Sequence, residues 1–167
     1  MSCCEVLYLK TTALTDCLEK GSIRCKMKVL LPLAKGFDEI EFATIVDILR
    51  RAEVDVIVAG LKENAVEGLH RVKVIPDVLV GELDVSTFDA IVLPGGLPAC
   101  ENLRQDERIL ELIREMHGKG KYVAAICCGP LVLSKAGILE GRQATMHPAG
   151  KDMLTGAHYV DKSVVVD

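Results

Sequence analysis

The residue of this chain best placed for chemistry is Cys127, which follows the small apolar segment 123–126 and precedes Gly129-Pro130. This order is typical of a strand that ends in a sharp corner and leads into a helix. Such a corner strains its tip residue and directs backbone N–H groups and the positive end of the helix dipole at its side chain. These partial charges favour a thiolate, so the pattern predicts a nucleophilic or redox-active Cys127 with a lowered pKa. The alternative is a cysteine buried for packing alone.

An acidic residue is expected beside this thiol. In a parallel sheet the carboxyl ends of the strands meet at one edge, and the loops 35–41, 94–96 and 127–129 all follow predicted strands there. Glu41 lies on the first turn of a predicted helix, within reach of a neighbouring corner. A carboxylic acid beside a thiolate donates a hydrogen bond to it, which lowers the thiol pKa and raises its own. Alternatively, Glu39 and Glu41 only complement the helix dipole.

Backbone donors and a histidine complete the candidate site. Gly95 and Gly96 allow backbone N–H groups to approach a substrate oxygen, and with the N–H of Cys128 they would form an oxyanion hole. The alternative for the two glycines is an ordinary turn. His147, before Pro148, is a candidate base or proton shuttle, or else a structural histidine.

Composition excludes several classes of partner. The 167 residues are half apolar and carry a net charge of −4 without a basic run, so nucleic acid is not an expected partner. No uncharged apolar stretch approaches the roughly 18 residues of a membrane span. We therefore expect a globular protein with one domain and no membrane partner.

The cysteines indicate a reducing compartment. Their number is odd and their spacing irregular, and no pair has zinc-ligand spacing, so we expect neither a disulfide framework, nor a metal site, nor a cofactor. The cytoplasm fits this pattern best. A strained disulfide between the adjacent Cys127 and Cys128 is an alternative to simple packing of Cys128. The seven cysteines are Cys3, Cys4, Cys17, Cys25, Cys100, Cys127 and Cys128.

The chain divides into an extension, residues 1–26, and a domain, residues 27–167. The extension has no clear periodicity and no signal-peptide pattern, and we expect it to be poorly ordered and to add nothing to the fold. In the domain, strand and helix patterns alternate, which predicts an α/β fold with a mostly parallel, doubly wound sheet covered by helices on both faces. Strands are predicted at 29–33, 54–59, 72–75, 90–93, 122–126, 143–146 and 163–166, and helices at 39–51, capped by Asp38, at 106–117 and at 130–136.

The last apolar run, 163–166, has no following segment to pair with. An uncovered apolar edge strand promotes aggregation. We therefore expect that the chain is truncated at its C-terminus or that another chain completes the sheet.

Together these segments resemble the ThiJ/PfpI superfamily, in particular the branch of the Parkinsonism-associated protein deglycase and its bacterial relatives. The resemblance runs in family order from Met27 to Asp167 and excludes the first 26 residues. The matching segments are 33–41, 46–52, 92–96, 124–130 and 146–148.

The resemblance implies a flavodoxin-like fold and a homodimer. It implies that Cys127 is the reactive cysteine, Glu41 the protonated acid beside it and His147 the nearby histidine, with backbone donors at Gly96 and Cys128. Two departures matter. The protease-like branch has histidine where this chain has Cys128, which argues against peptidase activity, and the family's last strand and terminal helices have no counterpart here.

The leading hypothesis is a cofactor-independent enzyme of the glyoxalase or deglycase type. Cys127 would add to glyoxal, methylglyoxal or their early adducts on proteins, and Glu41 and His147 would move protons. The second hypothesis is an oxidative-stress sensor or chaperone that uses the same cysteine. A cysteine peptidase is a weaker third.

Overall fold

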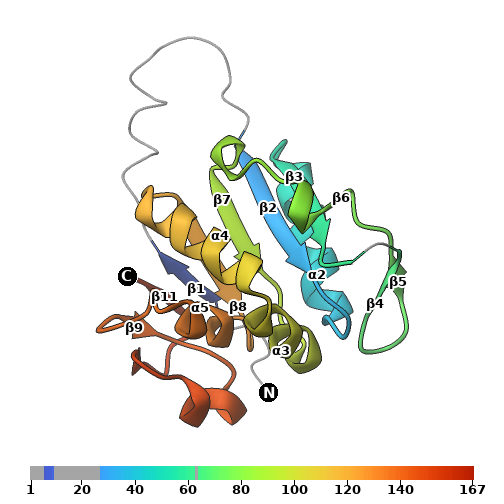
Figure 1. The fold of residues 1–167 in the computed structure, drawn as a ribbon. Helices are drawn as coiled ribbons and strands as arrows, with labels where there is room; N and C mark the ends of the chain where they lie inside the picture. The colour runs from blue at the N-terminus through green and yellow to red at the C-terminus, as the bar shows by residue number, and fades with distance from the viewer. Residues whose placement is uncertain (1–5, 10–26, 63) are drawn as a thin grey trace.

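The computed structural model describes residues 6–9, 27–62 and 64–167. Within them a seven-stranded sheet has the strand order β11-β1-β8-β7-β2-β3-β6 (Figure 1). Neighbours from β8 to β6 are parallel, whereas β1 is antiparallel to β8 and parallel to β11. The strands are β1 (Val6–Leu9), β2 (Lys28–Leu33), β3 (Asp55–Gly60), β6 (Val78–Leu79), β7 (Ala90–Leu93), β8 (Tyr122–Ile126) and β11 (Val164–Val166).

Helices cover both faces of this sheet. The chain steps from β2 to β3 in one direction and from β7 to β8 in the other, so crossovers of the same hand place their helices on opposite faces. α3, α4 and α5 pack together on one face and α2 lies on the other (Figure 1). The predicted mostly parallel sheet with two covered faces is confirmed. The helices are α2 (Glu39–Arg51), α3 (Leu97–Gln105), α4 (Glu107–Gly118) and α5 (Pro130–Ala136).

α2 begins where its cap predicts. The Asp38 carboxylate accepts hydrogen bonds from the N–H groups of Ile40 and Glu41, at 3.0 and 3.1 Å. The predicted range 39–51 is confirmed, and the helix packs against the core along one side only. The residues that pack against the core are Phe42, Ile45, Val46 and Leu49, which have i, i+3, i+4, i+7 spacing, whereas Ile40 and Ile48 are exposed.

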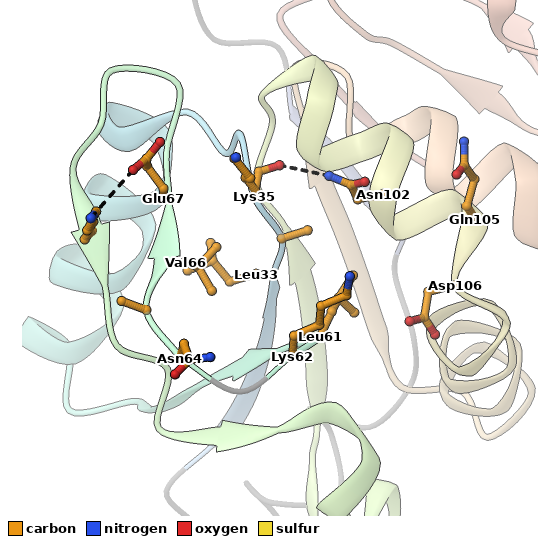
Figure 2. A pocket seen from close by; sticks show the side chains of 13 residues that line it. Leu33, Lys35, Leu61, Lys62, Asn64, Val66, Glu67, Asn102, Gln105 and Asp106 are labelled. Atoms are coloured by element: carbon orange, nitrogen blue, oxygen red, sulfur yellow. Dashed lines mark hydrogen bonds and ion pairs between the residues drawn. The ribbon is translucent and has the colours of Figure 1, made fainter.

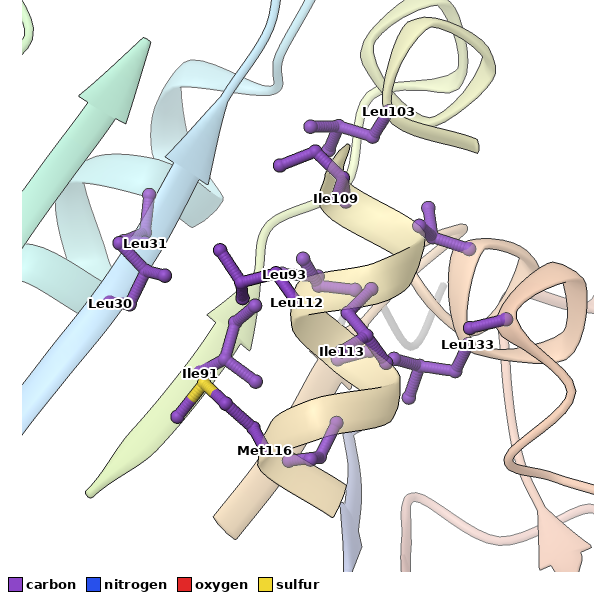
Figure 3. Close-up of a cluster of buried hydrophobic side chains, with 14 of the residues drawn as sticks. Leu30, Leu31, Ile91, Leu93, Leu103, Ile109, Leu112, Ile113, Met116 and Leu133 are labelled. Carbon is purple, nitrogen blue, oxygen red and sulfur yellow. The ribbon is translucent and has the colours of Figure 1, made fainter. Parts of the chain in front are cut away.

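Buried apolar side chains of the core lie between α4 and the sheet (Figure 3). Ile109, Leu112, Ile113 and Met116 form one side of α4 and are at most 5% exposed, as the helical spacing predicts. They face β7 and β8, whose Ile91 and Val123 are fully buried. This cluster anchors β7 and β8, two of the three strands whose carboxyl ends lead into the candidate site.

Pro32 lies inside β2, a central strand, where a missing N–H would ordinarily break the ladder. Pairing of β2 with β7 is confined to Val29 and Leu30, while pairing with β3 continues from Lys28 to Leu33. Pro32 therefore lies beyond the last paired residue on the β7 side.

The edge formed by β11, β1 and β8 differs from expectation. The strand at Val6–Leu9 was not predicted, and it pairs with β8 on one side and β11 on the other. β11 therefore pairs with β1, a strand near the N-terminus, although Val164 and Val166 of β11 remain 54% and 53% exposed. The other residues of the 1–26 extension lie outside the described part of the chain. The expectation that they are poorly ordered therefore stays a prediction.

Several short elements were not predicted or are shorter than the predicted strands. The segment expected as a strand at 72–75 forms only β5 (Lys73–Val74), which pairs with β4 (Val66–Glu67) in a separate two-stranded sheet. Ile75 is 82% exposed, because this hairpin lies outside the main sheet. The strand predicted at 143–146 forms only β9 (Gln143–Ala144), which pairs with β10 (His158–Tyr159) in a second two-stranded sheet. The 3₁₀ helices are η1 (Val80–Glu82), η2 (Val85–Thr87) and η3 (Pro148–Met153).

Among the described residues, none of the helices combines the length and the apolar character that crossing a bilayer requires.

Candidate active site

Cys127 occupies a strained corner directly after β8. Its φ of 59° places a residue with a Cβ in the left-handed region. The turn is closed by a hydrogen bond from the Gly129 N–H to the Ile126 carbonyl at 2.8 Å, and α5 then begins at Pro130. The strained corner predicted from the sequence is therefore present, and the Cys127 side chain is partly exposed at its tip.

Glu41 reaches this corner from the first turn of α2. Its Oε2 accepts a hydrogen bond from the Gly95 N–H at 2.7 Å, and its carboxyl group is hydrogen-bonded to the Cys127 thiol. Glu39, two residues earlier, is directed elsewhere and accepts hydrogen bonds from the backbone N–H and Nδ1 of His70 at 2.5 and 3.1 Å. Only the second of the two candidate acids therefore belongs to the site.

Burial raises the pKa of Glu41. The hydrogen bond from Gly95 opposes this shift, the negative charge of Asp38 adds to it, and Cys127 and His147 oppose it more weakly. The net direction is the one expected from the sequence. A proton on this carboxyl group is held at a pH where an exposed glutamate has lost it.

The pKa of Cys127 shifts in the direction opposite to our prediction. A hydrogen bond with Cys128 raises it most, and burial and the negative charge of Glu41 raise it further. The prediction was wrong because it counted the backbone dipoles and a hydrogen bond donated by Glu41, and did not count the second thiol or burial. In the structure the immediate neighbours of the sulfur are an acid and a second thiol, and both disfavour the thiolate while the acid is ionised.

His147 lies at the same corner. Its N–H donates to the Cys127 carbonyl at 2.9 Å, and its Nδ1 accepts from the Ala149 N–H at 3.3 Å. With Nδ1 as acceptor, the neutral ring carries its proton on Nε2. The positive form of the ring lowers the pKa of Glu41, so the three candidate groups lie within electrostatic reach of one another.

The two glycines are required for close approach. A Cβ on Gly95 would lie 2.6 Å from the Cys127 Cβ and 3.1 Å from its Sγ, and nearer still to Glu41 Oε2. Gly96 has a φ of 97°, and a Cβ there would meet the backbone of residues 36–38. Because the Gly95 N–H is already bonded to Glu41, Gly96 and Cys128 remain as candidate oxyanion donors and Gly95 does not.

Cys100 was not singled out by the sequence analysis, yet it lies beside the site. It is on α3, fully buried, with its Sγ 2.8 Å from the Sγ of Cys128. Its N–H donates to the Gly96 carbonyl at 2.9 Å, which places it one turn into the helix that follows the two glycines. Recognising a helix start at Leu97, with Pro98 in its first turn, would have brought Cys100 to this corner.

A separate cavity of about 790 Å³ lies at the carboxyl ends of β2 and β3 (Figure 2). Its lining includes Lys35, Lys62, Glu67 and Asn102, and the Asn102 amide donates to the Lys35 carbonyl at 3.1 Å. None of the six candidate site residues lines it. In the described part of the chain, no three His, Cys, Asp or Glu side chains gather as a metal site.

The sequence is similar to those of known proteins over most of its length. A deglycase of Pyrococcus abyssi is 38% identical over 143 residues, which cover 84% of this chain and 86% of that protein. DJ-1 homolog A of Arabidopsis thaliana is 36% identical over 142 residues, also 84% of this chain. The match spans about a third of the length of the two Arabidopsis relatives, 36% and 32%.

Solved structures agree as well. The crystal structure of Drosophila melanogaster DJ-1beta superposes with a TM-score of 0.76 at 36% identity, covering 85% of this chain and 75% of that one. The family model described as DJ-1/PfpI family matches residues 27–167, the domain delimited from the sequence. With its flavodoxin-like sheet and its cysteine corner, the chain belongs to the DJ-1/PfpI family.

Proposed function

We propose that this chain is a cofactor-independent enzyme that uses Cys127 to convert small dicarbonyl aldehydes, glyoxal or methylglyoxal, and their early adducts on proteins. The observation that carries the proposal is the Glu41 carboxyl group, held between the Gly95 N–H at 2.7 Å and the Cys127 thiol. This acid can exchange a proton with the sulfur and then with a bound substrate. Family relatives named deglycases, 36–38% identical to the chain, support the enzyme class.

In the first step the sulfur adds to the aldehyde carbon. The raised pKa of Cys127 means that its thiol rests protonated, so Glu41 as carboxylate takes the proton while the S–C bond forms. The carbonyl oxygen becomes an oxyanion, which the N–H groups of Gly96 and Cys128 stabilise. Glu41 then returns the proton to this oxygen and gives a hemithioacetal.

In the second step a proton moves between the two carbons of the substrate. Glu41 removes it from the former aldehyde carbon and delivers it to the neighbouring carbon, with Nε2–H of His147 assisting at the second oxygen. The product is a thioester of Cys127. Water cleaves the thioester and releases lactate from methylglyoxal or glycolate from glyoxal, which restores the thiol. The overall change is addition of one water, so no external oxidant or reductant is needed.

The test is methylglyoxal consumption with lactate formation by the full chain. We expect Cys127→Ser to fall to the uncatalysed rate and Glu41→Gln to lose roughly 10²–10⁴-fold, the range of general acid–base catalysis. Glu39→Gln is the matched control, because Glu39 lies on the same helix turn but is bonded to His70. It should retain wild-type turnover.

Two results contradict the proposal. Unchanged turnover in Cys127→Ser rules out the sulfur as nucleophile. An equal loss in Glu39→Gln and Glu41→Gln would show that the charge of the helix, and not the contact with the thiol, matters.

We also propose a homodimer formed through α2. This helix has no buried residue, and its Ile40 and Ile48 are 78% and 58% exposed, although both are large and apolar. A second copy of the same face would cover them. Light scattering should give twice the chain mass for the wild type and a single chain mass for Ile48→Lys; a wild-type monomer at all concentrations contradicts this interface.

A redox-sensing role is the second candidate, favoured by the partly exposed thiol of Cys127 next to a buried thiol. Such a role, like the enzyme, fits a reducing compartment such as the cytoplasm, because the three cysteines of the described residues are free thiols.

A further inference from the structure

Three sulfur atoms form a continuous chain at the corner. The Cys127 and Cys128 thiols are hydrogen-bonded to each other, and the Cys128 Sγ lies 2.8 Å from the Cys100 Sγ. Exposure falls along this chain: Cys127 is partly exposed, Cys128 is 6% exposed and Cys100 is fully buried. An oxidant from solvent therefore meets Cys127 first.

We propose that Cys127, Cys128 and Cys100 form a thiol relay, in which a hydroperoxide oxidises Cys127 and the oxidation ends as a buried Cys100–Cys128 disulfide. The inference rests on the reactivity of Cys127 that the proposed function also uses.

The geometry favours the Cys100–Cys128 pair as the end point. A disulfide has an S–S distance of about 2.05 Å, so the two sulfurs at 2.8 Å need to approach by less than 1 Å. The Cys100 sulfur also contacts the Pro94 carbonyl, but at 3.9 Å this contact is weak. A Cys127–Cys128 disulfide, by contrast, would close a strained ring between adjacent residues.

Direct oxidation of the buried pair is disfavoured. Peroxides react with thiolates, and buried thiols in apolar surroundings are inert. Cys128 is 6% exposed and Cys100 is fully buried, so a peroxide from solvent does not reach either sulfur, whereas Cys127 is partly exposed. The oxidation must then enter through Cys127.

The oxidation proceeds in three steps. The Cys127 sulfur attacks the peroxide, the O–O bond breaks, and Cys127 becomes a sulfenic acid while an alcohol or water leaves. The Cys128 sulfur attacks the Cys127 sulfur and displaces water, which gives a transient disulfide between the two. The Cys100 sulfur then attacks Cys128, and Cys127 leaves and takes up the proton that Cys100 has lost. In total, one peroxide and two thiols give one disulfide, one alcohol or water, and one water.

The relay returns Cys127 as a free thiol. Without it, a second peroxide would carry the sulfenic acid on to the sulfinic acid, which thiols do not reduce. The Cys100–Cys128 disulfide would instead be reversible by dithiol reductants.

The test uses the full-length chain, a few equivalents of hydrogen peroxide, alkylation of the remaining thiols and tryptic mass spectrometry. Cys100 lies in the tryptic peptide 74–104, and Cys127 and Cys128 lie in 122–135. The relay predicts a cross-link between these two peptides with Cys127 alkylated. It also predicts loss of the cross-link in Cys100→Ser, with the oxidation trapped inside peptide 122–135 as the Cys127–Cys128 disulfide.

Cys127→Ser supplies the second arm. The relay predicts no cross-link at the same peroxide dose, because the entry point is gone; a cross-link at the wild-type rate would overturn it. If wild-type Cys127 becomes sulfinic acid while Cys100 and Cys128 stay alkylated, the relay is wrong and the reactive thiol of the proposed function stands. If no cysteine at the corner is oxidised, both are wrong. If the buried serine of Cys100→Ser disturbs folding, Cys100→Ala replaces that variant in the experiment.

Discussion

Gly95 is the position where a single methyl group should disturb both the fold and the chemistry. Alanine there would place its Cβ 2.6 Å from the Cys127 Cβ and 3.1 Å from the Sγ, in space that Glu41 also borders. Overpacking of this kind costs about 1–3 kcal/mol. For a domain of this size, 1 kcal/mol lowers Tm by roughly 2–4 °C, so we expect a fall of about 2–12 °C.

The same substitution should separate the acid from the thiol. Glu41 must move away from the new methyl group, and the hydrogen bond from the Gly95 N–H at 2.7 Å is then lost or lengthened. Aldehyde turnover should therefore fall by roughly 10²-fold or more, as for loss of a general acid–base group.

The matched control is Gly118→Ala at the end of α4, where a Cβ meets no atom within 4 Å. Alanine is favoured over glycine in a helix by roughly 0.5–1 kcal/mol, so the Tm of this variant should equal or exceed that of the wild type. Calorimetry and methylglyoxal consumption measure both effects. Equal Tm values and equal turnover in the Gly95 and Gly118 variants would refute the close-packing argument.

Three other perturbations test the fold and the site. Asp38→Ala removes the cap of α2 and should lower the free energy of unfolding by about 1 kcal/mol, with an unchanged urea m-value. Ile113→Ala, in the core, should cost about 2–5 kcal/mol, whereas Ile75→Ala, at an exposed site, should stay within about 0.5 kcal/mol. Because the pKa of Glu41 is raised above 4.5, the folded chain holds this proton more tightly than the unfolded chain. The stability from this proton is complete at lower pH and is lost as pH rises through the folded pKa. The free energy of unfolding of Glu41→Gln should therefore rise relative to that of the wild type as pH increases. Urea unfolding at several pH values measures this, and parallel curves for the two proteins would contradict the shift.

Elements with local signals were predictable from the sequence. Asp38 and the first turn of α2 specify their own start, and the spacing of Ile109, Ile113 and Met116 specifies the buried side of α4. The corner at Cys127 was predictable because the small strand and Gly129-Pro130 occur together.

Features that depend on distant contacts were not predictable. β1 is a short segment whose strand character depends on pairing with β8, more than a hundred residues away. The helix α3 begins immediately after two glycines and contains Pro98, a pattern that is also typical of a loop. The direction of the Cys127 pKa shift depends on Cys128 and Glu41 as actual neighbours, which spacing alone does not reveal.

The position of β1 bears on how the chain assembles. Its amides and those of β11 belong to one ladder, since Val6 to Tyr8 pair with Val164 to Val166. Pairing across such sequence separation is slow to form, so β2, β3, β7 and β8 can associate before either end of the chain joins them. Hydrogen exchange should accordingly show β1 and β11 opening as one cooperative unit, below the protection of the central strands.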